Sequence, residues 1–218
     1  MISFERILIS CLVFGFASFA NAQSPPWPAE APDDWLLAFI DIETTGLIPG
    51  HHEMIDIGIV MTDLDGVELD NLFIRIQPEH PERTEEGARA VNAFDTERWK
   101  QLNALSTDQA IERIVSFHNG VAGDKSVLMV AFNSHFDAAF LDHLFRARER
   151  SWRELYNYFI LDLPSMAWIL GERGLTGQAL TTVLGIEDEP HVALQHTGIT
   201  GALVNARIYR ALLERSGR

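Results

Sequence analysis

The chain has 218 residues, of which 47% are hydrophobic and 22% are charged, and its net charge is −14 with a pI near 4.9. This length and composition predict one globular domain with a sizeable core, and nothing indicates a second domain. The acidic balance excludes a protein that coats nucleic acid non-specifically, because its overall field repels polyanions. A nucleic-acid substrate would have to be held locally, for example at one chain end.

The first 34 residues are expected to lie outside the folded domain. Residues 1–22 are typical of a secretory signal peptide, with an apolar run at 7–20 and a small-residue cleavage signal, Ala20-Asn-Ala22. Residues 23–34 are rich in proline and predict an extended linker. We therefore expect a periplasmic or secreted protein that is cleaved after Ala22 and is not attached to a membrane in its mature form. A start codon chosen too far upstream would also create such a signal.

The next part of the chain predicts an antiparallel meander of strands. An apolar run at residues 36–42 and a second one at 54–62 predict buried strands, and the alternating pattern at 68–76 predicts a third. Asp63-Leu-Asp-Gly66 predicts the hairpin turn between the last two.

The rest of the chain alternates helical and strand patterns. Helices are expected at residues 85–91, 95–102, 106–119, 135–148, 162–170, 175–183 and 193–214, and strands at 126–132 and 159–161. The helix at 106–119 is expected to end before Gly120. A meander followed by this alternation predicts an α/β domain over 35–214, with a mixed sheet, helices on both faces and a short tail at 215–218.

Two carboxylates lie near the end of the first predicted strand. Side chains alternate along a strand, so Asp41 and Glu43 point to the same side, roughly 6.6 Å apart along the backbone. The neighbouring Ile40 and Ile42 form the other, packing face. Like charges in such surroundings are costly unless a cation compensates them, and a divalent metal is the simplest such cation.

A second acidic position follows the strand at 126–132. Asn133 or Ser134 is expected to cap the next helix, and Asp137 falls in its first turn, where the helix dipole should lower the pKa of the carboxyl group. Taken alone, Asp137 is more typical of a helix-start residue than of a ligand. Beside Asp41 and Glu43 the ligand role is favoured.

Two histidines lie near the start of the last predicted helix. If that helix begins near residue 193, His191 lies on the preceding loop and His196 on the helical face that meets the sheet. The two rings can converge only in that case, because five residues turn an ideal helix by about 140°. Each histidine alone is typical of a hydrogen-bonded core residue. His51 and His52 are expected to lie in a solvated turn.

Three segments together resemble the exonuclease motifs of the DEDDh family, which includes ribonuclease T, oligoribonuclease and polymerase proofreading domains. They are Asp41-Ile-Glu-Thr-Thr-Gly-Leu47, Asn133-Ser-His-Phe-Asp137, and His191 followed by a helix. The resemblance covers residues 35–214. It implies a ribonuclease H-like mixed five-stranded sheet, an antiparallel meander followed by parallel strands, flanked by helices. It also implies a metal-dependent 3′–5′ exonuclease acting on the 3′ end of single-stranded DNA or RNA.

The resemblance also implies roles for individual residues. Two divalent cations, Mg²⁺ or Mn²⁺, would be held by Asp41, Glu43 and Asp137, with Glu43 also orienting the attacking water. His191 would be the general base. The terminal nucleotide would be contacted by five further residues: Thr44, Thr45, Leu47, Asn133 and Phe136.

One position departs from the family pattern. The family has an aspartate five residues after the catalytic histidine, and that position here is His196. As a metal ligand in its place, an imidazole would suit Mn²⁺ or Zn²⁺ better than Mg²⁺. The expected outcomes are an enzyme with altered metal preference or weakened activity, or a catalytically silent binding module with the same fold. A metal-dependent phosphoesterase acting on small nucleotides is a third alternative. The sequence does not indicate an oligomeric state.

Overall fold

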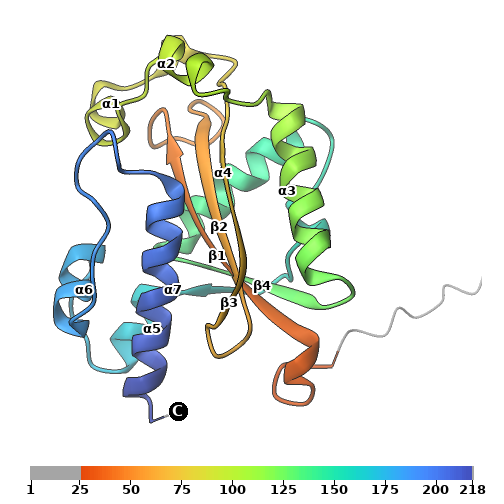
Figure 1. Ribbon diagram of the computed structural model, residues 1–218, viewed down its shortest axis with the longest axis vertical. Coiled ribbons are helices and arrows are strands. Elements are labelled where there is room, and N and C mark those ends of the chain that lie inside the picture. Colours follow the sequence, from red (N-terminus) through yellow and green to blue (C-terminus); the bar gives the residue numbers. More distant parts are fainter. Residues whose placement is uncertain (1–25, 218) are drawn as a thin grey trace, which may run out of the picture.

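The fold is a five-stranded mixed sheet between two layers of helices, in a computed structural model that describes residues 26–217 (Figure 1). The strand order is β3-β2-β1-β4-β5. The strands are β1 (Trp35–Thr44), β2 (Met54–Thr62), β3 (Glu68–Arg75), β4 (Ser126–Ala131) and β5 (Ile160–Asp162). β1, β2 and β3 pair antiparallel, whereas β4 runs parallel to both β1 and β5. This arrangement confirms the predicted ribonuclease H-like sheet.

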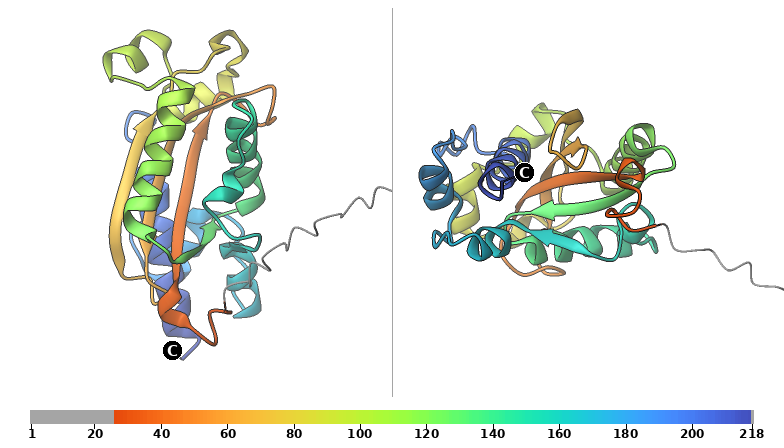
Figure 2. Two further views of the ribbon diagram at one scale, coloured as in Figure 1. Left: turned by 90° about the vertical axis from the view of Figure 1, so that its right-hand side faces the viewer. Right: turned by 90° about the horizontal axis from the view of Figure 1, so that it is seen from below.

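The helices divide between the two faces and one end of the sheet. They are α1 (Glu86–Asn92), α2 (Thr96–Gln101), α3 (Thr107–Ala122), α4 (Ser134–Arg146), α5 (Leu163–Ile169), α6 (Gly177–Leu184) and α7 (Gly198–Arg215). One face packs against α3 and α4, and the other against α5, α6 and α7 (Figure 2). α1 and α2 lie beyond the end of β1 (Figure 1). None of the helices in residues 26–217 has the length and apolar character needed to cross a membrane.

The central strand β1 is buried on both faces because each face carries a layer of helices. Leu36, Ala38 and Ile40 pack toward α3 and α4, whereas Leu37 and Phe39 pack toward α7. The alternation continues along the strand, so the odd-numbered carboxylates near its end face the layer that contains α7.

α7 approaches β1 and β2 so closely at its start that no side chain fits between them. A Cβ atom on Gly198 would lie 2.5 Å from the backbone oxygen of Asp41, and one on Gly58 would lie 2.3 Å from the backbone of Gly198. The buried carboxylate of Asp56 on β2 accepts a 2.9 Å hydrogen bond from the backbone N–H of Gly198. The start of α7 is therefore fixed beside the acidic end of β1.

β1 and β4 diverge before either strand ends. Their parallel pairing stops at Phe39 and Val130. Beyond that point side chains take over the open backbone groups of β1, with Asn205 donating to the oxygen of Ile40 at 3.2 Å. The divergence opens a space at the carboxyl ends of the two strands, which is where ligands bind in many α/β folds.

Two expected helix boundaries are wrong. α3 runs through Gly120 to Ala122 and ends at Gly123, which has a φ of +56° and so takes a conformation that glycine adopts at low cost. α7 begins at Gly198 rather than near residue 193, because Thr197 caps it in a capping box with Thr200. The second correction moves His196 off the helix and onto the loop before it.

The expected linker is only partly as predicted. Its described part, residues 26–34, contains a turn and a short 3-10 helix, Pro32–Asp34, instead of remaining extended. The indole N–H of Trp35 donates to the oxygen of Pro26 at 2.8 Å, which ties this segment to the domain. The predicted signal peptide at residues 1–22 lies outside the described residues. Asn133 precedes α4 as predicted, but its side chain makes no capping hydrogen bond.

Candidate functional site

A pocket of about 420 Å³ opens at the end of β1, beside the start of α7. Its walls combine ionisable side chains with apolar ones. The ionisable group includes Asp41, Glu43, Glu189 and His196, and the apolar group includes Leu47, Val91 and Phe136. The combination provides an acidic floor for a cation next to apolar surface for an organic ring.

Asp41 lies at the centre of the acidic floor. Its carboxylate rests against the bare Cα of Gly201 in α7, since a Cβ atom there would come within 2.2 Å of Asp41 Oδ2. Burial and then the charges of Asp137 and Glu43 raise the pKa of Asp41 well above its usual value. The carboxylate therefore ionises reluctantly without a compensating cation.

Asp137 is not among the residues that line the pocket and is almost fully buried, at 3% exposure, but its charge acts on Asp41. Burial raises the pKa of its carboxyl group well above the usual value, and the charge of Glu43 adds to this effect. The backbone N–H groups of Ile42 and of Asp137 itself act in the opposite direction. The expected lowering of its pKa by the helix dipole is therefore wrong, because the cost of burial is larger.

Glu43 is held at both carboxylate oxygens. Asn92, the last residue of α1, donates from Nδ2 to Glu43 Oε2 at 3.2 Å and to the backbone oxygen of Thr44 at 3.0 Å. Its Oδ1 accepts from the N–H of Phe94 at 3.0 Å. On the other side, His196 Nε2 lies 3.0 Å from Glu43 Oε1. The role of Asn92 was not predicted, and a contact between residues 49 positions apart leaves no local signal in the sequence.

His196 lies between two carboxylates. Its Nε2 contacts Glu43, its Nδ1 lies 3.2 Å from Glu189 Oε2, and its side chain is 19% exposed. The contacts with Glu189 and Glu43 raise the pKa of His196 to about 11, so the ring is an imidazolium at neutral pH in the cation-free chain. No role at the site was predicted for Glu189, which precedes His191 in the sequence.

His191 lies outside the site. Its side chain is 55% exposed, and its Nε2 contacts Asp188 Oδ2 at 2.9 Å. Because α7 begins at Gly198, the histidine directly before the helix is His196. The structure thus brings His196 to the carboxylates and does not bring His191 there.

The predicted substrate-contact residues fall into two groups. Thr44, Leu47 and Phe136 line the pocket. Thr45 and Asn133 are not among the lining residues. Thr45 is fully buried and its hydroxyl accepts from the N–H of Glu53, whereas Asn133 is exposed to solvent.

His52 is buried, so the expected solvated turn is wrong at this residue. Its ring fills the space beside Gly46, where a Cβ atom would lie 2.6 Å from the ring, and its Nδ1 accepts from the N–H of Ile48 at 3.0 Å. His52 therefore supports the turn that carries Leu47 at the edge of the pocket.

The donor chemistry of the site fits a divalent cation. Asp41, Glu43 and Asp137 offer hard oxygen donors, and burial first and neighbouring carboxylates second raise the pKa values of Asp41 and Asp137. As the side chains stand, no three His, Cys, Asp or Glu groups in residues 26–217 form a coordination shell. Glu43 is engaged by Asn92 and His196, so a cation would have to displace at least the histidine contact.

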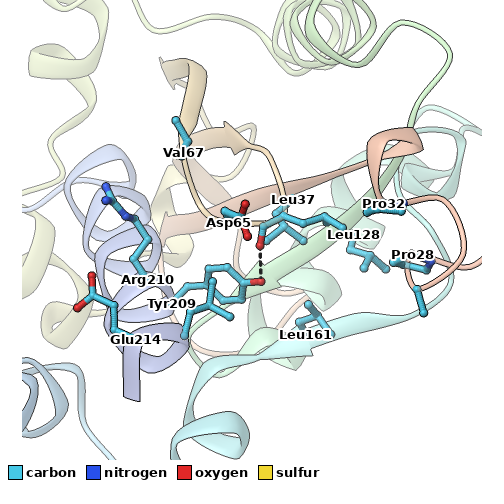
Figure 3. Close-up of a pocket in the computed structure, with 13 residues that line it drawn as sticks. Pro28, Pro32, Leu37, Asp65, Val67, Leu128, Leu161, Tyr209, Arg210 and Glu214 are labelled. Carbon is cyan, nitrogen blue, oxygen red and sulfur yellow. Dashed lines mark hydrogen bonds between the residues drawn. The ribbon is translucent and has the colours of Figure 1, made fainter. Parts of the chain in front are cut away.

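A second hollow lies at the opposite end of β1 and differs in chemistry. This groove of about 800 Å³ is lined mainly by apolar residues such as Leu37, Leu128 and Leu161 (Figure 3). The hydroxyl of Tyr209 crosses it to donate to the oxygen of Leu64 at 2.8 Å (Figure 3). The groove has no group of facing carboxylates like that at the other end, which makes the acidic pocket the candidate active site.

Comparisons with known proteins show the family and the fold of the chain. The family model described as Exonuclease (RNase_T) matches residues 38–209. Among solved structures, Exonuclease I from Methylocaldum szegediense is 17% identical with a TM-score of 0.69, and the match covers 84% of this chain and 41% of that one. The zinc-bound E. coli ExoI–ssDNA complex is 16% identical with a TM-score of 0.68, covering 84% and 41%.

A third solved structure is closer in length. The nuclease domain of 3'hExo, a DEDDh family member bound to rAMP, is 14% identical with a TM-score of 0.67, covering 82% of this chain and 92% of that one. No curated protein sequence matches the chain. At these identities the structural matches establish the fold, and the chain spans well under half the length of the Exonuclease I proteins.

Proposed function

Because the chain belongs to the exonuclease family whose model matches residues 38–209, and shares its fold with a DEDDh member, we propose that it is a metal-dependent 3′–5′ exonuclease. Its substrate is the 3′ end of single-stranded DNA or RNA. The observation that carries this proposal is that Asp41, Glu43 and Asp137 interact electrostatically and that His196 contacts Glu43, at a pocket that also has apolar lining residues. A net charge of −14 suits recognition of one chain end better than binding along a duplex.

In the proposed enzyme, Asp41, Glu43 and Asp137 hold the divalent cations, Mg²⁺ or Mn²⁺. When bound, such cations supply an activated water and stabilise the leaving 3′ oxygen. The walls formed by Leu47, Val91 and Phe136 then take the terminal nucleoside, with Thr44 at the same edge. These walls exclude water from one side of the scissile phosphate.

His196 takes the place predicted for His191 as general base. It accepts the water proton at Nε2, the atom that faces Glu43. In the cation-free chain this atom carries a proton, because two carboxylates stabilise the imidazolium. If Glu43 held a cation, its contribution would be lost while that of Glu189 would remain, so the ring would lie closer to the neutral form that a base requires.

If His196 is the catalytic histidine, the departure from the family pattern no longer lies at residue 196. Five residues after His196 comes Gly201, in the first turn of α7, whose Cα touches the carboxylate of Asp41. In the proposal the family's aspartate is therefore missing at 201, and His196 is not a substituted ligand. Asp41 occupies part of the space that a side chain at 201 would fill. The second cation is expected to bind weakly, because it lacks one carboxylate.

A direct assay tests the proposal. The purified protein is given a single-stranded oligonucleotide labelled at its 5′ end, in Mg²⁺ and separately in Mn²⁺, with an Asp41→Asn variant as control. We expect a ladder that shortens from the 3′ end, release of mononucleotides, and loss of both in the variant. A folded protein that yields no ladder in either metal would contradict the exonuclease assignment.

The second candidate function is a catalytically silent module that binds nucleic-acid ends. The observations that favour it are the missing side chain at Gly201 and the engagement of Glu43 by His196. It predicts that a 3′-OH oligonucleotide binds without turnover and that Asp41→Asn leaves the affinity unchanged. Fluorescence anisotropy on the same oligonucleotide separates the two functions.

We also propose that the protein is exported and cleaved after Ala22. The apolar run and small-residue signal of residues 1–22 support this. Mass spectrometry of the purified native protein should give an N-terminus at Gln23, and a retained residue 1 would contradict export by this route.

A further inference from the structure

Two adjacent acidic residues on the loop before α7 contact different histidines. Asp188 contacts His191 at the surface, whereas Glu189 turns into the pocket and contacts His196. Glu189 is only 21% exposed, and its Oε2 lies 3.2 Å from His196 Nδ1. Nothing in the family resemblance assigns a role to this carboxylate.

The contact at Nδ1 determines where the other ring nitrogen points. The two nitrogens of an imidazole lie on different sides of the ring, so a partner at Nδ1 also orients Nε2. The contact of Nδ1 with Glu189 is a close charge contact rather than an aligned hydrogen bond. It would favour a neutral ring protonated at Nδ1 once Glu43 no longer accepts from Nε2. In this chain Nε2 then faces Glu43 at 3.0 Å, on the floor of the pocket. His196 ends a hydrogen-bonded turn, in which its backbone N–H donates to the oxygen of Val192 at 2.9 Å. This bond holds the backbone but leaves the rotation of the ring to the partners of its nitrogens.

Glu189 is itself tied to a rigid element. Its Oε2 lies 3.3 Å from the hydroxyl of Thr200, in the first turn of α7, which shares its one proton between this carboxylate and the backbone oxygen of Thr197 at 2.7 Å. The same hydroxyl accepts from the N–H of Thr197, which caps the helix. The position of the carboxylate therefore follows the start of α7, the part of the helix that packs directly on β1 and β2.

We propose that Glu189 is a positioning residue for His196, which holds the ring at Nδ1 and so aims Nε2 at the reacting water beside Glu43. The inference rests on the proposed function, in which Nε2 takes the proton. The rival role for Glu189 is that of an additional cation ligand, since it lines the same pocket as Asp41 and Glu43. The 3.2 Å contact with His196 and the anchoring by Thr200 favour the positioning role.

Glu189→Gln and its neighbour Asp188→Asn form a matched pair of variants for the test. Glu189→Gln should lower kcat about 10- to 100-fold, the usual range for losing a carboxylate that orients a histidine, with KM within about threefold. Asp188→Asn should leave both parameters unchanged, because its partner His191 is exposed and outside the pocket. Glu189→Asp should recover part of the lost kcat. An unchanged kcat in Glu189→Gln would overturn the proposal.

Cation binding separates the two roles of Glu189. Titration of Mn²⁺ into metal-free protein, followed by calorimetry, should give affinities within about threefold for wild type and Glu189→Gln if the carboxylate acts only through His196. A loss of Mn²⁺ affinity beyond tenfold in Glu189→Gln alone would identify Glu189 as a ligand and overturn the positioning role.

A spectroscopic readout makes the inference independent of activity. In ¹⁵N-labelled protein with saturating Mg²⁺, the imidazole spectrum of His196 should show the proton retained at Nδ1 in wild type and in Asp188→Asn. In Glu189→Gln the two tautomers should mix. If wild type cleaves nothing, the proposed function fails, whereas this spectrum still decides whether Glu189 orients the ring. An identical spectrum in wild type and Glu189→Gln would overturn the inference.

Discussion

The loop before α7 holds two histidine–carboxylate pairs whose carboxylates are similarly buried but whose histidines are not. In the pair of His191 and Asp188, three residues apart, His191 is 55% exposed and Asp188 is 22% exposed. The pair of His196 and Glu189 lies in the acidic pocket, where Glu43 adds a second carboxylate to the same ring. Of the two pairs, the second is the one whose histidine contacts a carboxylate on β1.

The difference between the pairs comes from where α7 begins. Thr197 and Thr200 form the capping box, and Gly198 allows the helix start to touch β1. The residue just before the cap is therefore held at the acidic end of the strand, and a residue six positions before the cap is not. The number of residues between a histidine and the start of α7 therefore decides whether the histidine reaches the pocket.

The largest expected effect concerns the reaction. His196→Asn should lower kcat by about 10²- to 10⁴-fold, the usual range for removing a general base, whereas His191→Asn should change it less than threefold. The measurement is the rate of release of mononucleotides from a 3′-labelled oligonucleotide in Mn²⁺. An equal loss of kcat in the two variants would contradict the assignment of the catalytic role to His196 alone.

The second prediction concerns pH and stability. The pKa of His196 is raised from 6.5 to about 11, so the folded protein holds a proton that the unfolded chain loses. This contribution is fully present below pH 6.5 and is lost as pH rises toward 11. The loss of this contribution between pH 7 and 9 should lower the free energy of unfolding of metal-free wild type by about 3 kcal/mol.

The matched variants again separate the two pairs. His196→Gln should flatten the pH dependence between pH 7 and 9, and His191→Asn should keep the wild-type slope. Urea unfolding in EDTA, followed by circular dichroism, measures both. A His196→Gln protein with the wild-type slope would mean that the ring is not held between Glu43 and Glu189.

The third prediction concerns the anchor of α7. Burial raises the pKa of Asp56 to about 7, and the charge of Glu43 adds to this. The folded state thus favours the protonated acid, so stability is greatest at low pH and falls as pH rises from about 4 to 7. Asp56→Asn should reduce this fall by about 3 kcal/mol, since its amide oxygen can still accept from Gly198, and should leave the contributions of Asp41 and Asp137. A fall of the same size in the variant would exclude Asp56 as its source.

The smallest expected effect concerns Gly201. Gly201→Asp should raise the Mg²⁺-dependent rate about tenfold, because it adds a hard oxygen ligand beside Asp41. Gly201→Ala is the control, since its methyl group also displaces Asp41 but adds no ligand, and it should lower the rate. If both variants lower the rate, position 201 is not where the site lacks a carboxylate.

Most of the fold was predictable because its signals are local. The apolar runs of β1, β2 and β4 and the turn at Asp63–Gly66 follow from periodicity and turn chemistry, and the structure confirms them. The family resemblance rests on three motifs in the right order, and the match over residues 38–209 confirms it.

The site was less predictable because its contacts join distant residues. The apolar pattern near residue 193 extends the predicted helix, and it hides the cap at Thr197 that places His196 on the loop. Thr197-Gly-Ile-Thr200 carried the signal for that cap, although threonine at the fourth position is a weaker capping-box residue than glutamate. No local pattern brings Asn92 or Glu189 to the pocket, because each meets its partner only after the sheet and α7 assemble.

One structure would test the central claim most directly, namely that the carboxylates at the end of β1 hold the cations and that His196 is the histidine beside them. Crystals grown with Mn²⁺ and a nucleoside monophosphate allow an anomalous difference map at the manganese edge. We predict a peak within coordination distance of Asp41 and Glu43, with His196 facing the site and His191 at the surface. A manganese peak at His191 and Asp188, or none near Asp41, would contradict the account.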